Sequence, residues 1–157
     1  MLLPNVLRDG ILEATELGDE VRVIDVWTRA IIGYFNGAVA GVVPVTQPAL
    51  QSAPSAAVRG ALIGISAPGM GAVSIQNAMV ALWAALAASP PLYFTGALAI
   101  TPPPALPGLA AILLPLFLAN TAANLPRPDA CLAIATAIHG ANLGGTATIL
   151  LSSVPIL

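Results

Sequence analysis

The sequence has no lysine and few charged residues of any kind. Charged residues make up 8% of its 157 residues and hydrophobic residues 57%, whereas soluble domains carry roughly 25% charged residues. Nine charged side chains lie within residues 1–29, and the 67 residues between Arg59 and Arg127 have none. A soluble monomer needs surface charges to stay dispersed in water. The uncharged stretch is therefore expected to face lipid or other protein.

Other scarcities exclude particular ligands. The net charge of −2 leaves no basic cluster for phosphates, so we expect no nucleic-acid partner. Cys131, the single cysteine, cannot build a thiolate metal site alone. His139, the single histidine, precedes Gly140 and could ligate the metal of a tetrapyrrole, but a hydrogen bond between helices is the expectation. We predict no cofactor and no metal.

Catalytic motifs are missing as well. Ser66 in the segment 64–68 lacks the second glycine of a nucleophile elbow. The segment Gly69-Met70-Gly71 lacks the third glycine of a dinucleotide loop and the lysine of a phosphate loop. No pair of carboxylates lies in the apolar region. We therefore expect that the protein is not an enzyme.

Residues 1–29 form an acidic segment with the pattern of an amphipathic helix. Apolar residues recur with a period of 3.5 residues, which is the period of a helical seam. Helices that lie on membranes usually carry Lys and Arg, so this acidic helix is expected to dock on another protein chain or on a second copy of itself. A solvated cap without a partner is the alternative. The proposed docking residues are Leu3, Leu7, Leu17, Val21 and Ile24.

Residues 30–157 have the pattern of an apolar helical membrane domain. A helix of twenty residues spans about 30 Å, which is enough for the core of a bilayer. Prolines separate the apolar segments, and residues 92–104 are expected to form a re-entrant or interfacial loop. The fold predicted is all-α: a small multi-pass transmembrane helical protein with an N-terminal amphipathic helix and about four spans, within residues 26–45, 70–88, 105–124 and 130–151.

Small residues in the apolar segments predict close helix contacts. Glycines at four-residue spacing let two backbones approach and gain dispersion contacts. Side-chain amides in such segments usually bond across helices, and a polar pathway for solutes is the alternative. The predicted helix-packing residues are Gly33, Gly37, Gly41, Gly60, Gly64, Gly140 and Gly144, and the amides are Asn36, Gln76, Asn77, Asn120, Asn124 and Asn142.

Three functions are compatible with this sequence. The first is a non-catalytic structural or accessory subunit of a larger membrane-embedded assembly, located in a membrane as an integral protein. The second is a structural component of a virus particle or protein shell, buried between subunits. Segments rich in Ala, Gly, Ser and Thr rather than Leu and Phe favour protein surroundings, in a membrane complex as well as in a shell. The third is a small channel, holin or carrier. The partners expected are other chains of a large complex or copies of this chain, with a lipid bilayer.

Overall fold

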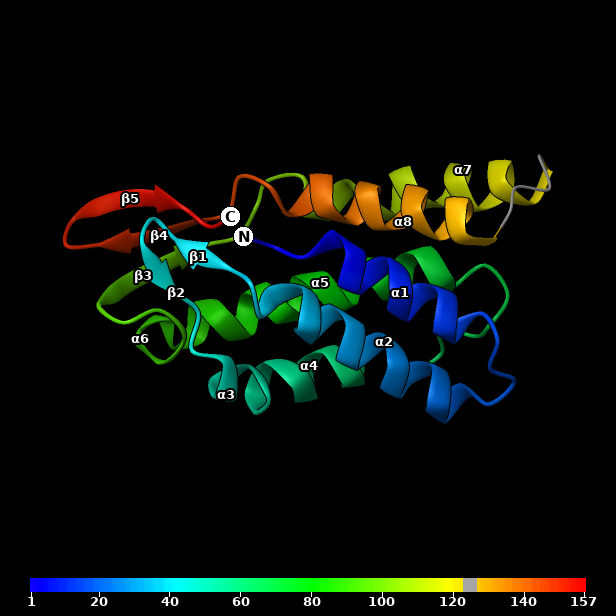
Figure 1. Cartoon of the computed structure of the whole chain (residues 1–157), viewed down its shortest axis with the longest axis horizontal. Helices are drawn as coiled ribbons and strands as arrows, with labels where there is room; N and C mark the ends of the chain where they lie inside the picture. The colour runs from blue at the N-terminus through cyan, green and yellow to red at the C-terminus, as the bar shows by residue number, and fades with distance from the viewer. Residues whose placement is uncertain (123–126) are drawn as a thin grey trace.

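The computed structural model describes residues 1–122 and 127–157, and it combines helices with two small antiparallel sheets (Figure 1). The helices lie along the long axis, and the sheets lie at one end. The helices are α1 (Pro4–Ala14), α2 (Glu20–Phe35), α3 (Gln47–Leu50), α4 (Ala53–Ala61), α5 (Gly71–Ala88), α6 (Pro90–Tyr93), the 3-10 turn η1 (Leu106–Gly108), α7 (Leu109–Ala122) and α8 (Arg127–Asn142). The strands are β1 (Val39–Ala40), β2 (Val43–Pro44), β3 (Ala97–Thr101), β4 (Thr146–Ile149) and β5 (Ser152–Pro155).

The sheets join parts of the chain that are far apart in sequence. Strands β1 and β2 form a hairpin, and the second sheet has the order β3-β4-β5 with antiparallel neighbours. The C-terminus links the two sheets, because Val39 and Leu157 exchange backbone N–H···O hydrogen bonds of 2.9 and 3.0 Å. Both sheets therefore form one end of a single fold.

The prediction of an all-α protein with four spans is wrong. Residues 97–101 and 146–155, expected in a re-entrant loop and in or beyond the fourth span, contain the three strands of the larger sheet. Among the described residues, one helix, α5, is long and apolar enough to cross a membrane, and 44% of its 18 residues are buried within the fold. A buried core helix passes the same test, so the expected membrane domain is not supported. Many residues of the apolar segments lie in the common core, where they cover one another.

Helix α5 supplies the centre of the core. The Trp83 ring is fully buried and meets Phe35 of α2 edge-on, with ring centroids 5.5 Å apart. Its indole N–H donates to Asn142 Oδ1 at 2.7 Å, and Asn142 Nδ2 donates to the Ile138 carbonyl at 2.7 Å. The Asn142 amide thus bonds across helices, as predicted from the sequence.

Other predicted amides have different environments. Gln76 Oε1 accepts from the Ala110 N–H at 2.8 Å, which satisfies one of the backbone donors that the first turn of α7 leaves free. The side-chain oxygen of Asn36 is buried and has no hydrogen-bond partner among the described residues. Asn77 is exposed on α5, while the side chain of Asn120 and residue Asn124 lie outside the described part of the chain.

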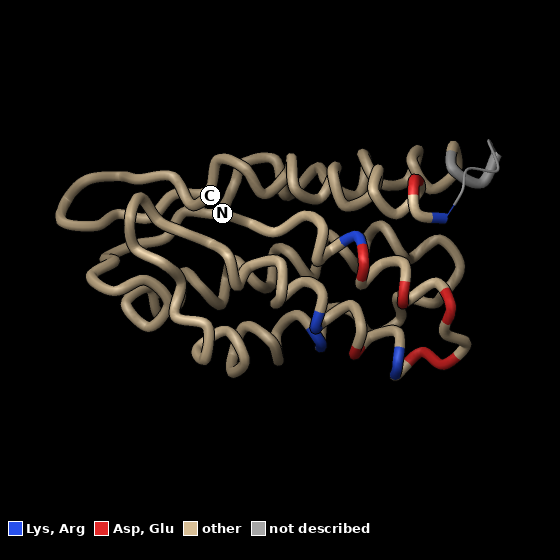
Figure 2. The backbone as a smooth tube through the Cα atoms, in the orientation of Figure 1, with Lys and Arg blue, Asp and Glu red and all other residues tan. Residues whose placement is uncertain are grey.

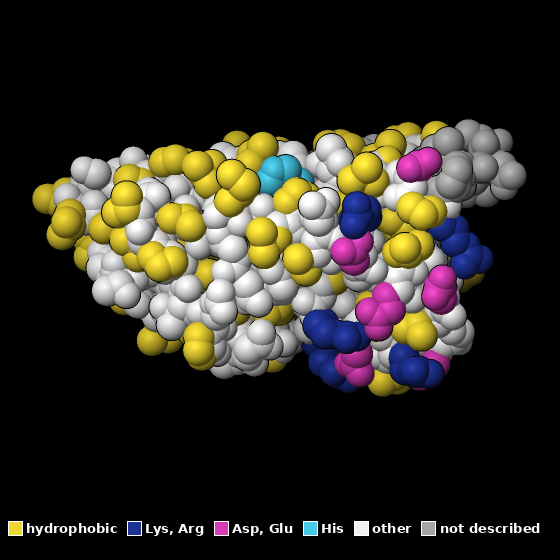
Figure 3. All heavy atoms as spheres, in the orientation of Figure 1, with side chains coloured by type: hydrophobic (Ala, Val, Ile, Leu, Met, Phe, Trp, Pro, Cys, Tyr) yellow, Lys and Arg dark blue, Asp and Glu magenta, His cyan; other side chains and the backbone are white. Residues whose placement is uncertain are grey.

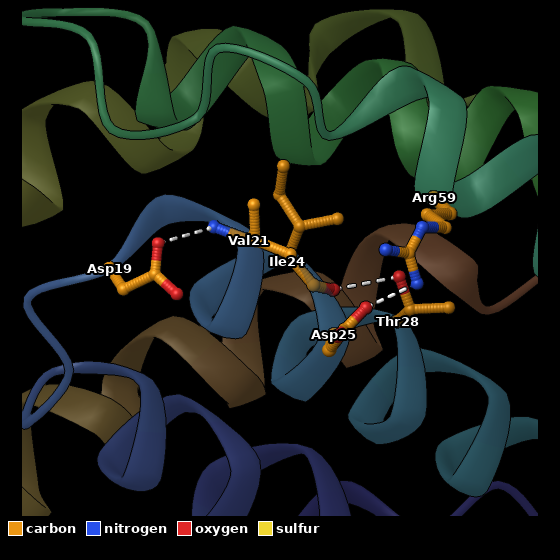
Figure 4. A network of polar contacts seen from close by, with 6 residues as sticks. All are labelled: Asp19, Val21, Ile24, Asp25, Thr28 and Arg59. Carbon is orange, nitrogen blue, oxygen red and sulfur yellow. Dashed lines mark hydrogen bonds and ion pairs between the residues drawn. The ribbon is translucent and has the colours of Figure 1, made fainter.

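The N-terminal segment forms two helices rather than one. Asp19 begins α2, and its carboxylate accepts from the Val21 N–H at 3.3 Å (Figure 4). Gly18, which weakens a helix, lies in the break between α1 and α2. The boundary expected between residues 29 and 30 therefore falls inside α2, whose buried face belongs to the common core.

The predicted packing glycines separate into three groups. A Cβ added at Gly33 would lie 2.9 Å from Val6 Cγ1, and one at Gly37 would lie 2.1 Å from the Met1 carbonyl oxygen, so both lie where α2 meets the N-terminal residues of the same chain. The second group lies in turns where φ is positive and consists of Gly41, Gly64 and Gly144. The third group is Gly60 and Gly140, and no described atom lies within 4 Å of a Cβ built at either position.

Gly145, which was not among the predicted packing residues, lies in close contact with the core. A Cβ at this position would lie 2.3 Å from Cη2 of the buried Trp83 ring. We expect Gly145→Ala to lower the free energy of unfolding by about 1–3 kcal/mol, as overpacking does in other cores. Urea unfolding followed by tryptophan fluorescence measures this. The matched control is Gly140→Ala in α8, where space is free, and it should leave stability unchanged or raise it by about 0.5–1 kcal/mol.

Candidate functional site

Charge divides the molecule into two ends. All charged residues belong to α1, the residues between α1 and α2, α2, α4 and the first turn of α8, whereas both sheets and helices α3, α5, α6 and α7 carry none. Figure 2 shows the charges gathered at the end opposite the sheets. We call the part formed by β1–β5, α3 and α6 the uncharged end. It has no charged side chain with which to hold water or repel another copy.

Large apolar side chains are exposed on the uncharged end. Figure 3 shows hydrophobic side chains spread over it on the face in view. Single exposed apolar residues are common on soluble proteins, but their accumulation on one surface marks a site of interaction. The most exposed residues here are Val42 (94%), Leu151 (89%), Leu150 (86%), Leu98 (63%) and Leu92 (61%).

The turn between β4 and β5 has an unusual composition. Ile149 pairs with Ser152, so Leu150 and Leu151 form a two-residue hairpin loop, and both have positive φ, 50° and 68°. Such turns favour Asn-Gly, because a side chain in this left-handed conformation costs roughly 1–2 kcal/mol per residue. The backbone conformation that exposes these two leucines therefore lowers the stability of the fold. We call this pair the leucine turn.

We call the opposite end, which carries the charged residues, the charged end. Ion pairs on its solvated surface connect three helices. An ion pair joins Arg59 of α4 to Asp25 of α2 (Figure 4), and another joins Arg29 to Glu13 of α1 at 3.2 Å. The side chains of both pairs are about half exposed, and exposed pairs contribute little to stability. These charges keep this end in contact with water.

An apolar cavity of about 410 Å³ lies at the charged end. It is open on one side, between the last turn of α1 and the first turns of α2, α5 and α8, with α7 beside them. Burial raises the pKa of the Cys131 thiol in its wall, and the nearby Arg127 guanidinium partly offsets this. Its lining is otherwise mainly aliphatic and aromatic, including Ile11, Trp27, Ile65, Ile75 and Ile134.

His139 forms a hydrogen bond between helices, as expected. Its Nδ1 lies 3.0 Å from the Tyr34 hydroxyl, which connects α8 to α2, and the two rings meet edge-on. Burial raises the pKa of Tyr34 far above its ordinary value, so its hydroxyl stays protonated. Within residues 1–122 and 127–157, no three His, Cys, Asp or Glu side chains form a group that could hold a metal ion.

The predicted docking seam lies mostly inside the fold. Leu7 and Ile24 are buried and Leu17 is half-buried, because α1 packs against α2 and α8 of the same chain. These residues need no second chain to cover them. Leu3 and Val21 are 40% and 56% exposed, and docking through them stays a prediction.

No protein family model, curated protein or solved structure matches this chain. The function is therefore argued from the uncharged end and the leucine turn. Sequence reasoning did not identify this site, because the signal for a hairpin, Asn-Gly or Asp-Gly between strands, is absent from the leucine turn.

The cost of the leucine turn can be measured in the isolated fold. The double variant Leu150→Asn, Leu151→Gly supplies the residues that this turn favours. Because it relieves two strained residues while adding the unfolded-state entropy of one glycine, its free energy of unfolding should rise by about 1–2 kcal/mol. Urea unfolding at low protein concentration provides the measurement. The control, Leu150→Ala with Leu151→Ala, retains the strain and should leave stability unchanged; an equal gain there would show that the side chains rather than the backbone carry the cost.

Proposed function

We propose that this chain is a non-catalytic structural subunit of a larger protein assembly in which the uncharged end is buried between subunits. The exposed valine and leucines of that end, on a surface without any charged residue, carry this proposal. Of the functions expected from the sequence, it corresponds to a component of a protein shell or virus particle. Inside an assembly such a surface makes apolar contacts that water cannot provide.

Composition supports protein rather than lipid as the covering phase. The uncharged end combines its exposed leucines with many small residues, such as the Ala and Thr of β3 and β4 and the Ser of β5. Small residues gain little by entering a bilayer, but they allow close approach of another protein surface. Helix α5 does not favour lipid either, since Leu82, Trp83 and Leu86 on it are fully buried in the core.

Association through the uncharged end can be tested with charge. The native chain should form oligomers in sedimentation velocity experiments without detergent. Val42→Lys with Leu98→Lys should shift it to monomers, because each buried lysine would have to lose its hydration without a partner. Circular dichroism should be unchanged, since both side chains are exposed in the fold.

The matched control places the same charge on the other end. Val21→Lys, on the exposed side of α2, should leave the oligomers intact, whereas loss of association there would move the interface to the face of α2 that carries Val21. A monomeric native chain that floats with uncharged phosphatidylcholine vesicles would overturn the proposal in favour of a lipid surface.

A further inference from the structure

We propose that the leucine turn of one copy inserts into the apolar cavity at the opposite end of the next copy, so that the chain assembles head to tail. This inference rests on the proposed function and supplies the geometry of its contact. Two features that the single chain leaves unexplained, an exposed apolar projection and an open apolar hollow, then become the two sides of one interface.

The turn has the properties of an inserted element. It projects from the end of the β4–β5 hairpin, at one extreme of the long axis (Figure 1). Leu150 and Leu151 are 86% and 89% exposed, so their side chains contribute little to the core of their own chain. Two leucines held at positive φ lower the stability of the isolated fold, and such strain concentrates at sites that contact other molecules.

The cavity has the chemistry and size for two leucine side chains. Its walls come from α1, α2, α5, α7 and α8 and are mainly apolar, with Thr15 and Arg127 as the polar exceptions. Apolar cavities of about 150 Å³ already hold a molecule of benzene, and this one measures about 410 Å³. Filling it would replace water against apolar walls with dispersion contacts.

The positions of the two features favour a head-to-tail contact between copies. The hairpin and the cavity lie at opposite ends of the molecule, because the cavity is bounded by the last turn of α1 and the first turns of α2 and α8 (Figure 1). Pairing two charged ends would bring the acids around Glu16, Asp19 and Glu20 together, which is unfavourable. Pairing two hairpins would leave both cavities open. A head-to-tail contact avoids both, and its repetition gives a ring or a filament.

A turn variant separates assembly from folding. Leu150→Asn with Leu151→Gly should make the chain fold more stably and yet weaken its self-association about 100-fold, the effect of losing the burial of two leucines. Sedimentation velocity across a dilution series measures the monomer and the oligomer and so gives the dissociation constant. Val80→Ala, on the exposed side of α5 and outside both the uncharged end and the cavity lining, is the matched control and should change the dissociation constant less than about tenfold.

Disulfide trapping tests which surfaces meet. The native Cys131 in the cavity wall is only 2% exposed. The trapping variant therefore carries Cys131→Ser, with Thr15→Cys at an exposed position of the cavity lining and Leu150→Cys at the opposite end. With diamide as oxidant at alkaline pH, two thiols would lose two electrons and two protons to form a disulfide between copies. We expect a ladder of dimers, trimers and longer products on a non-reducing gel.

The arms of the trapping experiment distinguish the possible contacts. Restoring Thr15 in the Leu150→Cys chain should abolish the ladder, and Val80→Cys on the exposed side of α5, in place of Leu150→Cys, should not produce one. Only dimers, formed with or without Thr15→Cys, would show pairing between hairpins and overturn the head-to-tail contact. If the native chain is monomeric, the proposed function fails first; if it is oligomeric but the turn variants assemble normally, this inference alone is wrong.

Discussion

The burial of the Trp83 ring is the interaction on which the rest of the structure depends. The ring lies against Phe35 of α2, its N–H donates to Asn142 of α8, and Gly145 leaves room for it just before β4 begins. One side chain therefore holds together two helices and the entry to the sheet. A polar N–H in this core needs its partner, because an unpaired buried donor costs about 1–3 kcal/mol.

The packing around Trp83 also determines where the uncharged end and the charged end lie. Because α8 stops at Asn142 and β4 follows at Thr146, the β4–β5 hairpin extends beyond the helices, away from the charged residues. The charged end keeps its contact with water through half-exposed ion pairs. The uncharged end has no such means, which is why association with another surface is the function that its chemistry supports.

The leucine turn connects local backbone energy with assembly. Residues held in unfavourable conformations persist where the surrounding structure enforces them, and they concentrate at functional sites. Here the strained pair is also among the most exposed apolar groups of the chain. Strain and exposure together are consistent with a segment selected for contact with another molecule rather than for the stability of its own fold.

The sequence by itself determined the helix at the centre of the core. The segment predicted over residues 70–88 and set apart by prolines is α5, Gly71–Ala88, whereas the single N-terminal helix and the segment over residues 130–151 did not form as predicted. The ends of α5 depend on backbone conformation within a few residues, so they can be read locally.

Only the tertiary structure decided what covers the apolar residues. The pattern at Leu7 and Ile24 required burial but did not say by which surface, and α2 and α8 of the same chain supply it. Strands β3 and β4 pair across more than forty residues, and their Ala and Thr residues show no alternation that would predict them. An uncharged composition indicates that a segment avoids water. It does not show whether lipid or another protein surface covers the segment, because both surfaces can be apolar.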